Sequence, residues 1–270
     1  MKSRKYLFFS IFIMIICITP VNSANNLTIV NKIYKFVCDI EPLKNPDSRD
    51  AAETKQETQE KRNGREESKK LKKRYIALTF DDGPHPEYTG KIIKILSEKK
   101  APATFFIVGN RAELHPVLLQ RMKQANCEIG NHTYDHIDLS KINNGDFLDQ
   151  MEKCNRAIYN ATGEYPKIYR PPFGRISKAN EQSISHKMSK ILWTVDSLDW
   201  TTPNKDKIIE KVVNSAKDKS IVLMHDFYSQ SVEALPEIID RLREKGYEFL
   251  TVSQLKELSS LPERMEYFVN

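Results

Sequence analysis

Between residues 75 and 258, short apolar or β-branched runs alternate with longer amphipathic segments. The short runs have the length and composition of strands, and they lie at 75–79, 104–108, 128–130, 167–170, 191–195, 221–224 and 248–252. The longer segments carry apolar residues at helical spacing at 88–99, 116–124, 146–160, 178–188, 205–216 and 232–245, and a short one at 254–258 closes the series. Regular strand–helix alternation predicts a parallel sheet covered by helices.

This pattern places the chain in the α/β class. Seven strand–helix units over about 185 residues predict a distorted (β/α) barrel with about seven parallel strands. An open, doubly wound parallel sheet is the alternative architecture. The sequence shows no internal repeat of fixed period.

The first residues have the composition of a targeting segment. Three basic residues precede an uncharged apolar run at 6–18, and Pro20 and the small residues at 21–24 follow it. The run is shorter than the roughly 20 apolar residues of a membrane span. We therefore expect a signal peptide at 1–23, with export to the periplasm, the cell envelope or the medium and no stable membrane span after cleavage. An uncleaved anchor is the alternative.

A polar, charged stretch separates this segment from the alternating region. Between Asp50 and Arg74, Leu71 is the one large aliphatic residue among many Lys, Arg, Glu and Gln. Such a stretch buries too little apolar surface to offset its ordering entropy. We expect a charged, disordered segment at 24–73, the folded domain at 74–258 and a C-terminal tail at 259–270. The basic end of the segment is either a solvated charge run, which we favour, or a contact with an anionic surface.

Composition narrows the classes of partner. The net charge of +6 over 270 residues is modest and dispersed, so we expect no nucleic-acid partner. Cys17 lies in the apolar run at 6–18, and Cys38, Cys127 and Cys154 are widely spaced. These three form neither a disulfide framework nor a Cys-x-x-Cys metal motif, although one pair could bond in an oxidising compartment. We expect Cys127 to be a buried small hydrophobe.

Reactive side chains follow the predicted strands where each strand ends. They are Asp81 and Asp82 after the first strand, His132 and His136 after the third, Arg170 at the end of the fourth, Asp196 and Asp199 after the fifth, and His225 after the sixth. The carboxyl ends of parallel strands meet at one edge, where α/β proteins collect their active sites. We therefore expect these residues to form one site.

Three of these residues make a plausible metal set. His132 and His136 are four residues apart, so both can reach one ion from a helical turn or a compact loop. Asp82 would complete a His-His-Asp set that leaves coordination open for water and substrate. Neighbouring side chains on a strand point to opposite faces, so Asp81 can stay free to move a proton. Taken alone, an Asp-Asp-Gly-Pro turn is common, and a His-x3-His pair is weak evidence for a metal site.

The other three histidines carry weaker signals. His85 lies in the turn after the aspartates, His115 precedes a predicted helix, and His186 lies on one. We expect all three to be exposed rather than functional.

Five segments resemble, in order, the motifs of the polysaccharide deacetylase family, which is the NodB-homology group or carbohydrate esterase family 4. They are 79–84, 132–136, 170–174, 196–200 and 223–225. The resemblance covers roughly residues 74–258 and does not extend to the first 73 residues. It implies a distorted β/α barrel and the metal-dependent removal of N- or O-acetyl groups from sugar polymers.

The resemblance also implies residue roles. Asp82, His132 and His136 match the ligands of one divalent transition metal ion, Zn²⁺ first, with Co²⁺, Ni²⁺ and Mn²⁺ as alternatives. Asp81 matches the general base that activates water, His225 the general acid, and Arg170 the residue that orients the base. An aspartate of the fourth motif matches the residue that tunes the acid. We favour Asp199 over Asp196 because Asp199 adjoins Trp200.

Four further residues match the substrate site of the family. Trp200 and Leu223 match the walls of the acetyl pocket, and the backbone N–H of Phe173 matches an oxyanion donor. Phe173 replaces the tyrosine often found there, which a main-chain donor tolerates. Pro172 of the same motif is grouped with the substrate-binding residues. Taken singly, Trp200 could be a core residue, Arg170 a structural ion pair and Asp196 a helix cap.

We therefore expect a metal-dependent N-deacetylase, acting as a monomer on polysaccharide that contains N-acetylglucosamine and releasing acetate. Peptidoglycan is the first choice of substrate and a chitin-like polymer the second. One alternative is an O-acetyl xylan esterase with the same site. Another is a catalytically dead carbohydrate-binding barrel, although every expected catalytic residue and ligand is present in the sequence.

Overall fold

The structure is a computed structural model, and it describes residues 73–258. The predicted signal peptide at 1–23, the charged segment up to residue 72 and the tail at 259–270 lie outside these residues. None of the helices in 73–258 combines the length and the apolar composition needed to cross a bilayer. Cys127 is buried, as predicted, and neither it nor the buried Cys154 is in a disulfide in this range.

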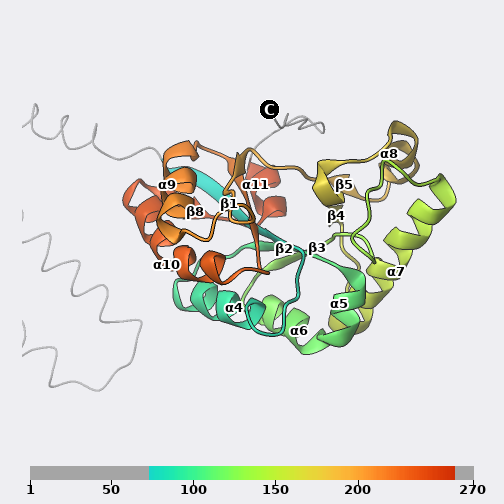
Figure 1. Cartoon of the computed structure of the whole chain (residues 1–270), viewed down its shortest axis with the longest axis horizontal. Coiled ribbons are helices and arrows are strands. Elements are labelled where there is room, and N and C mark those ends of the chain that lie inside the picture. Colours follow the sequence, from blue (N-terminus) through green and yellow to red (C-terminus); the bar gives the residue numbers. More distant parts are fainter. Residues whose placement is uncertain (1–72, 259–270) are drawn as a thin grey trace, which may run out of the picture. The chain divides into compact units, whose positions relative to one another are not determined.

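One parallel sheet of eight strands organises the described residues (Figure 1). The strands are β1 (Arg74–Asp81), β2 (Thr104–Ile107), β3 (Glu128–Asn131), β4 (Ile168–Tyr169), β5 (Ser189–Lys190), β6 (Val195–Asp196), β7 (Ser220–His225) and β8 (Tyr247–Phe249). Their hydrogen-bonded order is β5-β4-β3-β2-β1-β7-β6, and β8 pairs with the start of β1. Every ladder is parallel, as the alternation predicted.

The chain connectivity forces this sheet to curl. β5 and β6 lie at opposite ends of the hydrogen-bonded order, and a flat sheet of seven strands would hold them roughly 29 Å apart. Only residues 191–194 join the two strands, and a connection of this length reaches at most about 18 Å. Both edges must therefore bend toward each other, so the predicted distorted barrel is confirmed and the open doubly wound sheet is wrong.

Helices follow one another around the outside of the curled sheet (Figure 1). Their sequence in space runs from α9 (Lys205–Ser215) and α10 (Ser229–Glu244) through α4 (Thr89–Glu98) and α6 (Pro116–Gln124) to α7 (Asn144–Thr162) and α8 (Lys178–Ile184), with α5 (Gly109–Leu114) beside α6 and α7. The longest of them, α7, is bounded by side-chain and backbone signals. Asn143 accepts a hydrogen bond from the Asp146 N–H at the start, and Gly163 has φ 77° at the end.

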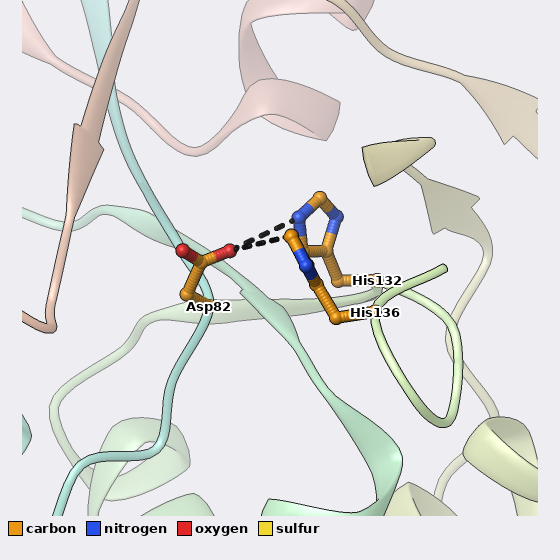
Figure 2. Close-up of side chains that lie close together, drawn as sticks. All are labelled: Asp82, His132 and His136. Atoms are coloured by element: carbon orange, nitrogen blue, oxygen red, sulfur yellow. Dashed lines mark ion pairs between the residues drawn. The ribbon is translucent and has the colours of Figure 1, made fainter. Parts of the chain in front are cut away.

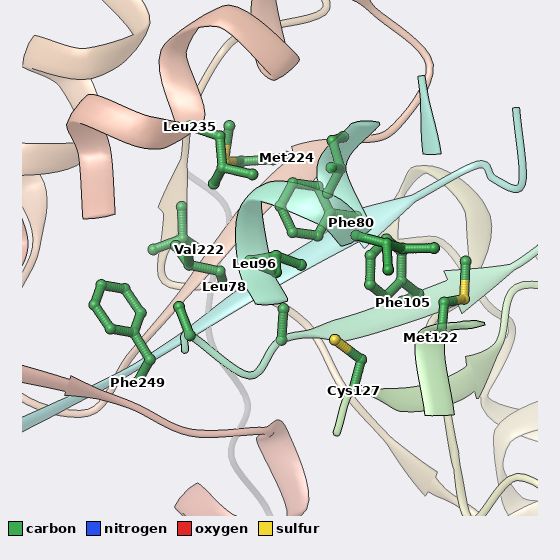
Figure 3. Packing of buried hydrophobic residues seen from close by; sticks show 14 of the residues in the cluster. Leu78, Phe80, Leu96, Phe105, Met122, Cys127, Val222, Met224, Leu235 and Phe249 are labelled. Carbon is green, nitrogen blue, oxygen red and sulfur yellow. The ribbon is translucent and has the colours of Figure 1, made fainter. Parts of the chain in front are cut away.

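The main core lies between the sheet and this ring of helices (Figure 3). Side chains of β1 alternate faces, so Ile76, Leu78 and Phe80 pack outward against the helices. The rings of Phe80 and Phe105 stack with centroids 5.1 Å apart, and neither is exposed. The intervening positions, among them Thr79 and Asp81, therefore face the inside of the curl.

A smaller apolar cluster fills the inside of the curl at the end opposite the carboxyl edge of the strands. Ala77, Phe106 and Ile221 from the sheet pack there against Val252 and Leu255 of α11 (Val252–Leu258). The start of α11 is fixed by a capping box, in which Thr251 and Gln254 each accept a hydrogen bond from the other's N–H. One end of the barrel is thus closed by a helix, and the other end is left for polar groups.

Most predicted elements are confirmed, and three differ from the prediction in their bounds. The run at 191–195 is not one strand, because residues 191–194 cross between the two sheet edges and only Val195 belongs to β6. The run at 248–252 is divided, because the capping box at Thr251 starts a helix. The helix at 178–188 ends at Ile184, so His186 lies in the exposed turn that follows. The short helix α5 was not predicted.

The stacked pair in the core generates a stability prediction. Phe105→Ala removes a fully buried ring and should lower the free energy of unfolding by about 3–5 kcal/mol. Leu148→Ala, at a 43% exposed position on α7, should change it by less than about 0.5 kcal/mol. Urea unfolding of both variants measures the difference, and equal effects would contradict the packing described.

Candidate active site

The carboxyl edge of the sheet brings the predicted residues together. Asp81 is paired in register with His225 across β1 and β7, and His132 directly follows β3. Asn131 at the end of β3 is in register with Tyr169, the residue before Arg170. The carboxyl ends of β7, β1, β3 and β4, four strands of one parallel sheet, therefore supply the site.

Asp82, His132 and His136 form a compact cluster (Figure 2). Asp82 Oδ1 lies 3.4 Å from Nε2 of His132 and 3.1 Å from Nε2 of His136. Ligands at about 2.0–2.1 Å from a tetrahedral ion lie roughly 3.3 Å from one another, so the observed separations fit one transition metal ion. Two imidazoles and one carboxylate are also a donor set that suits zinc-like ions better than calcium or magnesium.

The tautomer of His132 is fixed by its surroundings. Its Nδ1 lies 2.7 Å from the carbonyl oxygen of Arg170, which can only accept, so Nδ1 carries the proton. As a metal ligand the ring would be neutral, and its lone pair would then be on Nε2, the nitrogen that faces Asp82. An orienting hydrogen bond of this kind is the usual companion of a histidine metal ligand.

Asp82 is suited to be the anionic member of the set. Burial raises the pKa of its carboxyl group, but hydrogen bonds with His132 and His136 outweigh burial and hold the pKa well below its usual range. Its backbone has φ 76°, in the left-handed region.

Left-handed backbone recurs throughout the site. Thr133, His136, Phe173 and Leu198 have φ 67°, 56°, 58° and 60°, and all lie on loops at the carboxyl edge. Residues other than glycine rarely adopt such values, and those that do cluster at functional sites. The strained backbone indicates that these loops have a functional role besides connecting the strands to the helices.

Arg170 occupies the inside of the curl and is fully buried. Its Nη1 donates to Asp81 Oδ1 at 2.7 Å and to Thr79 Oγ1 at 2.8 Å. Nε donates to the carbonyl of Ile191 and Nη2 to that of Leu192. This pairing fixes one oxygen of Asp81, and its Oδ2 lies 3.9 Å from Nε2 of His132, beside the metal set.

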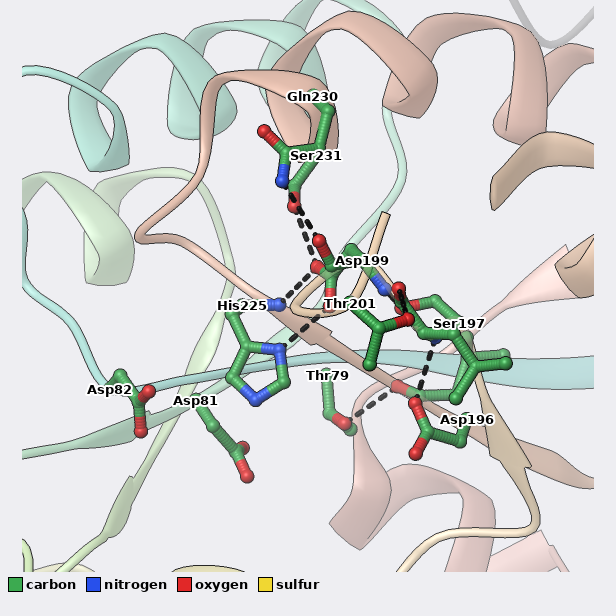
Figure 4. Close-up of polar contacts among 12 residues, drawn as sticks. Thr79, Asp81, Asp82, Asp196, Ser197, Asp199, Thr201, His225, Gln230 and Ser231 are labelled. Carbon is green, nitrogen blue, oxygen red and sulfur yellow. Dashed lines mark hydrogen bonds and ion pairs between the residues drawn. The ribbon is translucent and has the colours of Figure 1, made fainter. Parts of the chain in front are cut away.

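Asp199 holds His225 from the side away from the metal set (Figure 4). The His225 Nδ1–H donates to Asp199 Oδ1 at 2.7 Å, and Asp199 Oδ2 accepts from the His225 backbone N–H at 2.8 Å. Burial lowers the pKa of His225. The hydrogen bond and charge of Asp199, with the charges of Asp81 and Asp82, outweigh it and raise the pKa to about 9. The imidazole is therefore protonated at neutral pH.

The structure separates the two aspartates of the fourth motif. The carboxylate of Asp199 is fully buried against His225. The carboxylate of Asp196 instead accepts the N–H of Leu198 at 2.8 Å within its own loop. The geometry thus favours Asp199, and Asp196 shapes the turn.

The four predicted substrate-site residues divide by exposure. Phe173 and Trp200 are 59% and 54% exposed, whereas Leu223 and Pro172 are buried. The ring of Phe173 meets the ring of His136 edge-on at 5.0 Å, which places it beside the metal set. Phe173 and Trp200 are thus open to a ligand from solution.

Sequence reasoning missed several partners of these residues. Ser231 donates to Asp199 Oδ2 at 2.6 Å, and Thr79, quoted only as part of a motif, accepts from Arg170. Asp226 is fully buried behind the turn of the first motif, where a Cβ on Gly83 would clash with the Asp226 carboxylate. Burial raises the pKa of Asp226 to about 7 against the hydrogen bond from Thr89. No local pattern distinguishes these side chains from ordinary polar residues.

The three remaining histidines lie apart from the metal set. His186 is exposed, as predicted, but His85 and His115 are half-buried. The ring of His85 stacks on Tyr88 at 4.5 Å, and its Nδ1 accepts the N–H groups of Glu87 and Tyr88. His85 therefore shapes the turn before α4.

The motifs and this geometry correspond to one family of known proteins. The family model described as "Polysaccharide deacetylase" matches residues 68–188. A peptidoglycan-N-acetylglucosamine deacetylase of Bacillus cereus is 37% identical over 191 residues, which cover 67% of this chain and 87% of that protein. The chain belongs to the polysaccharide deacetylase family, and the resemblance of the five motifs is confirmed.

A second relative is the peptidoglycan-N-acetylmuramic acid deacetylase PdaC of Bacillus subtilis. It is 39% identical over 194 residues, which cover 72% of this chain and 41% of that protein. The chain thus spans about two fifths of the length of PdaC. A solved structure of PdaC superposes with a TM-score of 0.67 at 39% identity, over 70% of this chain and 92% of the solved chain.

The His225–Asp199 pair generates a pH prediction for the metal-free protein. Because the folded-state pKa of about 9 exceeds the ordinary 6.5, protonation of His225 stabilises the fold. This contribution, on the order of 3 kcal/mol, should be complete below pH 6.5 and lost as the pH rises through about 9. Asp199→Asn should remove it and lower the pKa of His225, whereas Asp196→Asn should not. An NMR titration of the imidazole measures this, and a wild-type pKa at or below 6.5 would contradict it.

Proposed function

We propose that this protein is a metal-dependent deacetylase that hydrolyses N-acetyl groups of polysaccharide containing N-acetylglucosamine. The observation that carries the proposal is the position of Asp81 and His225. One is held by Arg170 and the other by Asp199, and they lie on the same strand edge as the Asp82, His132 and His136 set. The site therefore offers a base, an acid and ligands for one ion together.

Asp82, His132 and His136 would hold the ion, with Zn²⁺ first and Co²⁺, Ni²⁺ or Mn²⁺ as alternatives. A bound divalent cation supplies a nucleophilic water at neutral pH and polarises the substrate carbonyl. The hydrogen bond from His132 to the Arg170 carbonyl keeps the Nε2 lone pair aimed into the set.

Asp81 is the proposed base. Arg170 and the strand fix its carboxylate, and its second oxygen faces the metal set, so it is placed to accept a proton from the attacking water. The water oxygen then bonds to the acetyl carbon. Arg170 acts by position, because its guanidinium lies inside the barrel and is closed to solvent.

His225 is the proposed acid. Its raised pKa keeps Nε2 protonated, and Asp199 on Nδ1 fixes the ring orientation. Nε2 would donate its proton to the sugar nitrogen as the C–N bond breaks, giving acetate and a free amine. The proposed acetyl pocket is formed by Trp200 and Leu223 with Pro172, and the Phe173 N–H would bind the oxyanion.

Peptidoglycan is the proposed substrate, and the cell envelope or its exterior the proposed location. The relatives from Bacillus are both named as peptidoglycan deacetylases. That polymer lies outside the cytosol, which agrees with the signal peptide expected at 1–23. The expectation of a monomer remains part of the proposal.

The proposal is tested by acetate release from peptidoglycan, N-acetylglucosamine oligomers and acetylated xylan. We expect release from the N-acetyl substrates, loss of release after chelation and recovery when Zn²⁺ is restored. Release from acetylated xylan alone would favour the O-acetyl esterase. Binding of these glycans without acetate release by the metal-loaded protein would favour the dead carbohydrate-binding barrel.

Substitution of the two adjacent aspartates should give different defects. Asp82→Asn should weaken metal binding, and excess metal should rescue part of the activity. Asp81→Asn should keep the metal but lower kcat by roughly 10²–10⁴-fold, because an amide cannot accept the proton. His225→Ala should resemble Asp81→Asn. Metal stoichiometry beside kcat separates these cases, and loss of metal from Asp81→Asn alone would show that the two roles are exchanged.

A further inference from the structure

The loop between the two histidine ligands has an unusual backbone. Thr133 and His136 have φ 67° and 56°, and the four peptide units that join His132 to His136 form no helix. The N–H groups of this loop therefore have no helical acceptors, and they must be paired elsewhere to hold one conformation.

Two side-chain amides provide those acceptors. Asn131 Oδ1 accepts the Thr133 N–H at 2.7 Å. Gln150 Oε1 accepts the next two, from Tyr134 at 3.1 Å and from Asp135 at 2.9 Å. Three consecutive backbone donors between the histidines are thus satisfied by side chains, two of them by one oxygen of α7.

The opposite edge of the loop is paired as well. The N–H of Gly109 donates to the carbonyl of Thr133 at 2.9 Å, and that of Asn110 to the carbonyl of Tyr134 at 3.1 Å. The loop is therefore held between the start of α5 and the side chain of Gln150. Gln150 is the side chain on α7 that accepts two backbone hydrogen bonds from this loop, so a substitution there tests its contribution.

The side chain of Gln150 also donates a hydrogen bond to the carboxylate of Asp135. It is 8% exposed, and its Nε2 donates to Asp135 Oδ2 at 2.8 Å, while Asp135 Oδ1 accepts from Asn110 Nδ2. The position requires one acceptor and one donor on the same planar group, and a carboxamide supplies both without a charge.

The two histidines depend on this loop unequally. His132 has an orienting bond of its own, from Nδ1 to the Arg170 carbonyl. Within residues 73–258, no hydrogen bond orients Nδ1 of His136, and its ring is 28% exposed with Phe173 at its edge. The direction of His136 is therefore set mainly by its backbone, one residue beyond the amides that Gln150 binds.

We propose that Gln150 is a positioning residue of the metal site, whose carboxamide fixes the loop so that His136 reaches the ion held by Asp82 and His132. This inference rests on the metal site of the proposed function. Gln150 touches neither ion nor substrate, and it acts through the backbone of Tyr134 and Asp135.

The first test is the Zn²⁺ affinity of the purified protein, measured by competition with a chromophoric chelator. Gln150→Ala should raise the dissociation constant by roughly 10- to 100-fold, the range typical for residues that support a metal ligand. The matched control is Glu128→Ala at the other end of β3, where the carboxylate accepts from Ser253 and Thr104 beneath the barrel. This control should lower the thermal midpoint and leave the Zn²⁺ affinity unchanged.

The second test exchanges donor and acceptor. Gln150→Glu keeps the oxygen that accepts the two backbone N–H groups, but it loses the donor and places a carboxylate against Asp135. The Zn²⁺ affinity should fall. Adding Asp135→Asn restores a donor opposite the new carboxylate, so the double variant should recover affinity that Gln150→Glu lost.

Two outcomes would overturn this inference alone. One is a Gln150→Ala affinity that equals that of the wild type or shifts no more than in Glu128→Ala. The other is a double variant that binds Zn²⁺ no better than Gln150→Glu. Failure of the wild-type protein to bind Zn²⁺ would overturn the metal site of the proposed function together with this inference.

Discussion

The buried guanidinium of Arg170 is the interaction on which the rest of the site depends. Its side chain binds Asp81 and Thr79 on β1, and it also takes the carbonyls of Ile191 and Leu192. Those carbonyls belong to the crossing that links the two sheet edges, so one cation ties the central strand to the closure of the curl. A buried charge is tolerated only when it is paired and its donors are satisfied, and here Nε, Nη1 and Nη2 all have acceptors.

The same residue connects the fold to the metal set. The backbone carbonyl of Arg170 accepts the proton of His132 Nδ1, while its side chain holds Asp81. The candidate metal ligand His132 and the proposed base Asp81 are thus both held by Arg170, the residue that directly follows β4. Across the site, Asp199 does for His225 what Arg170 does for Asp81. The partner of His225 is a carboxylate and the partner of Asp81 is a guanidinium, so the two groups lie in different electrostatic environments, as the proposed acid and base roles require.

The loops at this edge are held in their conformation by hydrogen bonds to nearby side chains and backbone groups, and not by the ladders of a helix or a sheet. Asp82 and His136 both have left-handed backbone, and the chain beside each is fixed by groups from other elements. Gly83 leaves room for the buried carboxylate of Asp226, and Gln150 takes the amides before His136. A rigid parallel sheet with strained, well-bonded loops at one edge can present several side chains to one small volume.

The sequence by itself determined the class of fold and the candidate residues of the site. Periods of two and of 3.6 are local, so alternating strands and helices, the strand ends and the spacing of His132 and His136 could all be predicted. The tertiary structure decided how these elements connect and which side chains contact one another. Residues 191–194 read as a strand but bridge the sheet edges, and Arg170 meets Thr79 across 91 positions of sequence. Asp199 rather than Asp196 faces His225. Gln150 on α7 binds the loop between His132 and His136. Such contacts depend on how the sheet curls, and no local pattern carries that information.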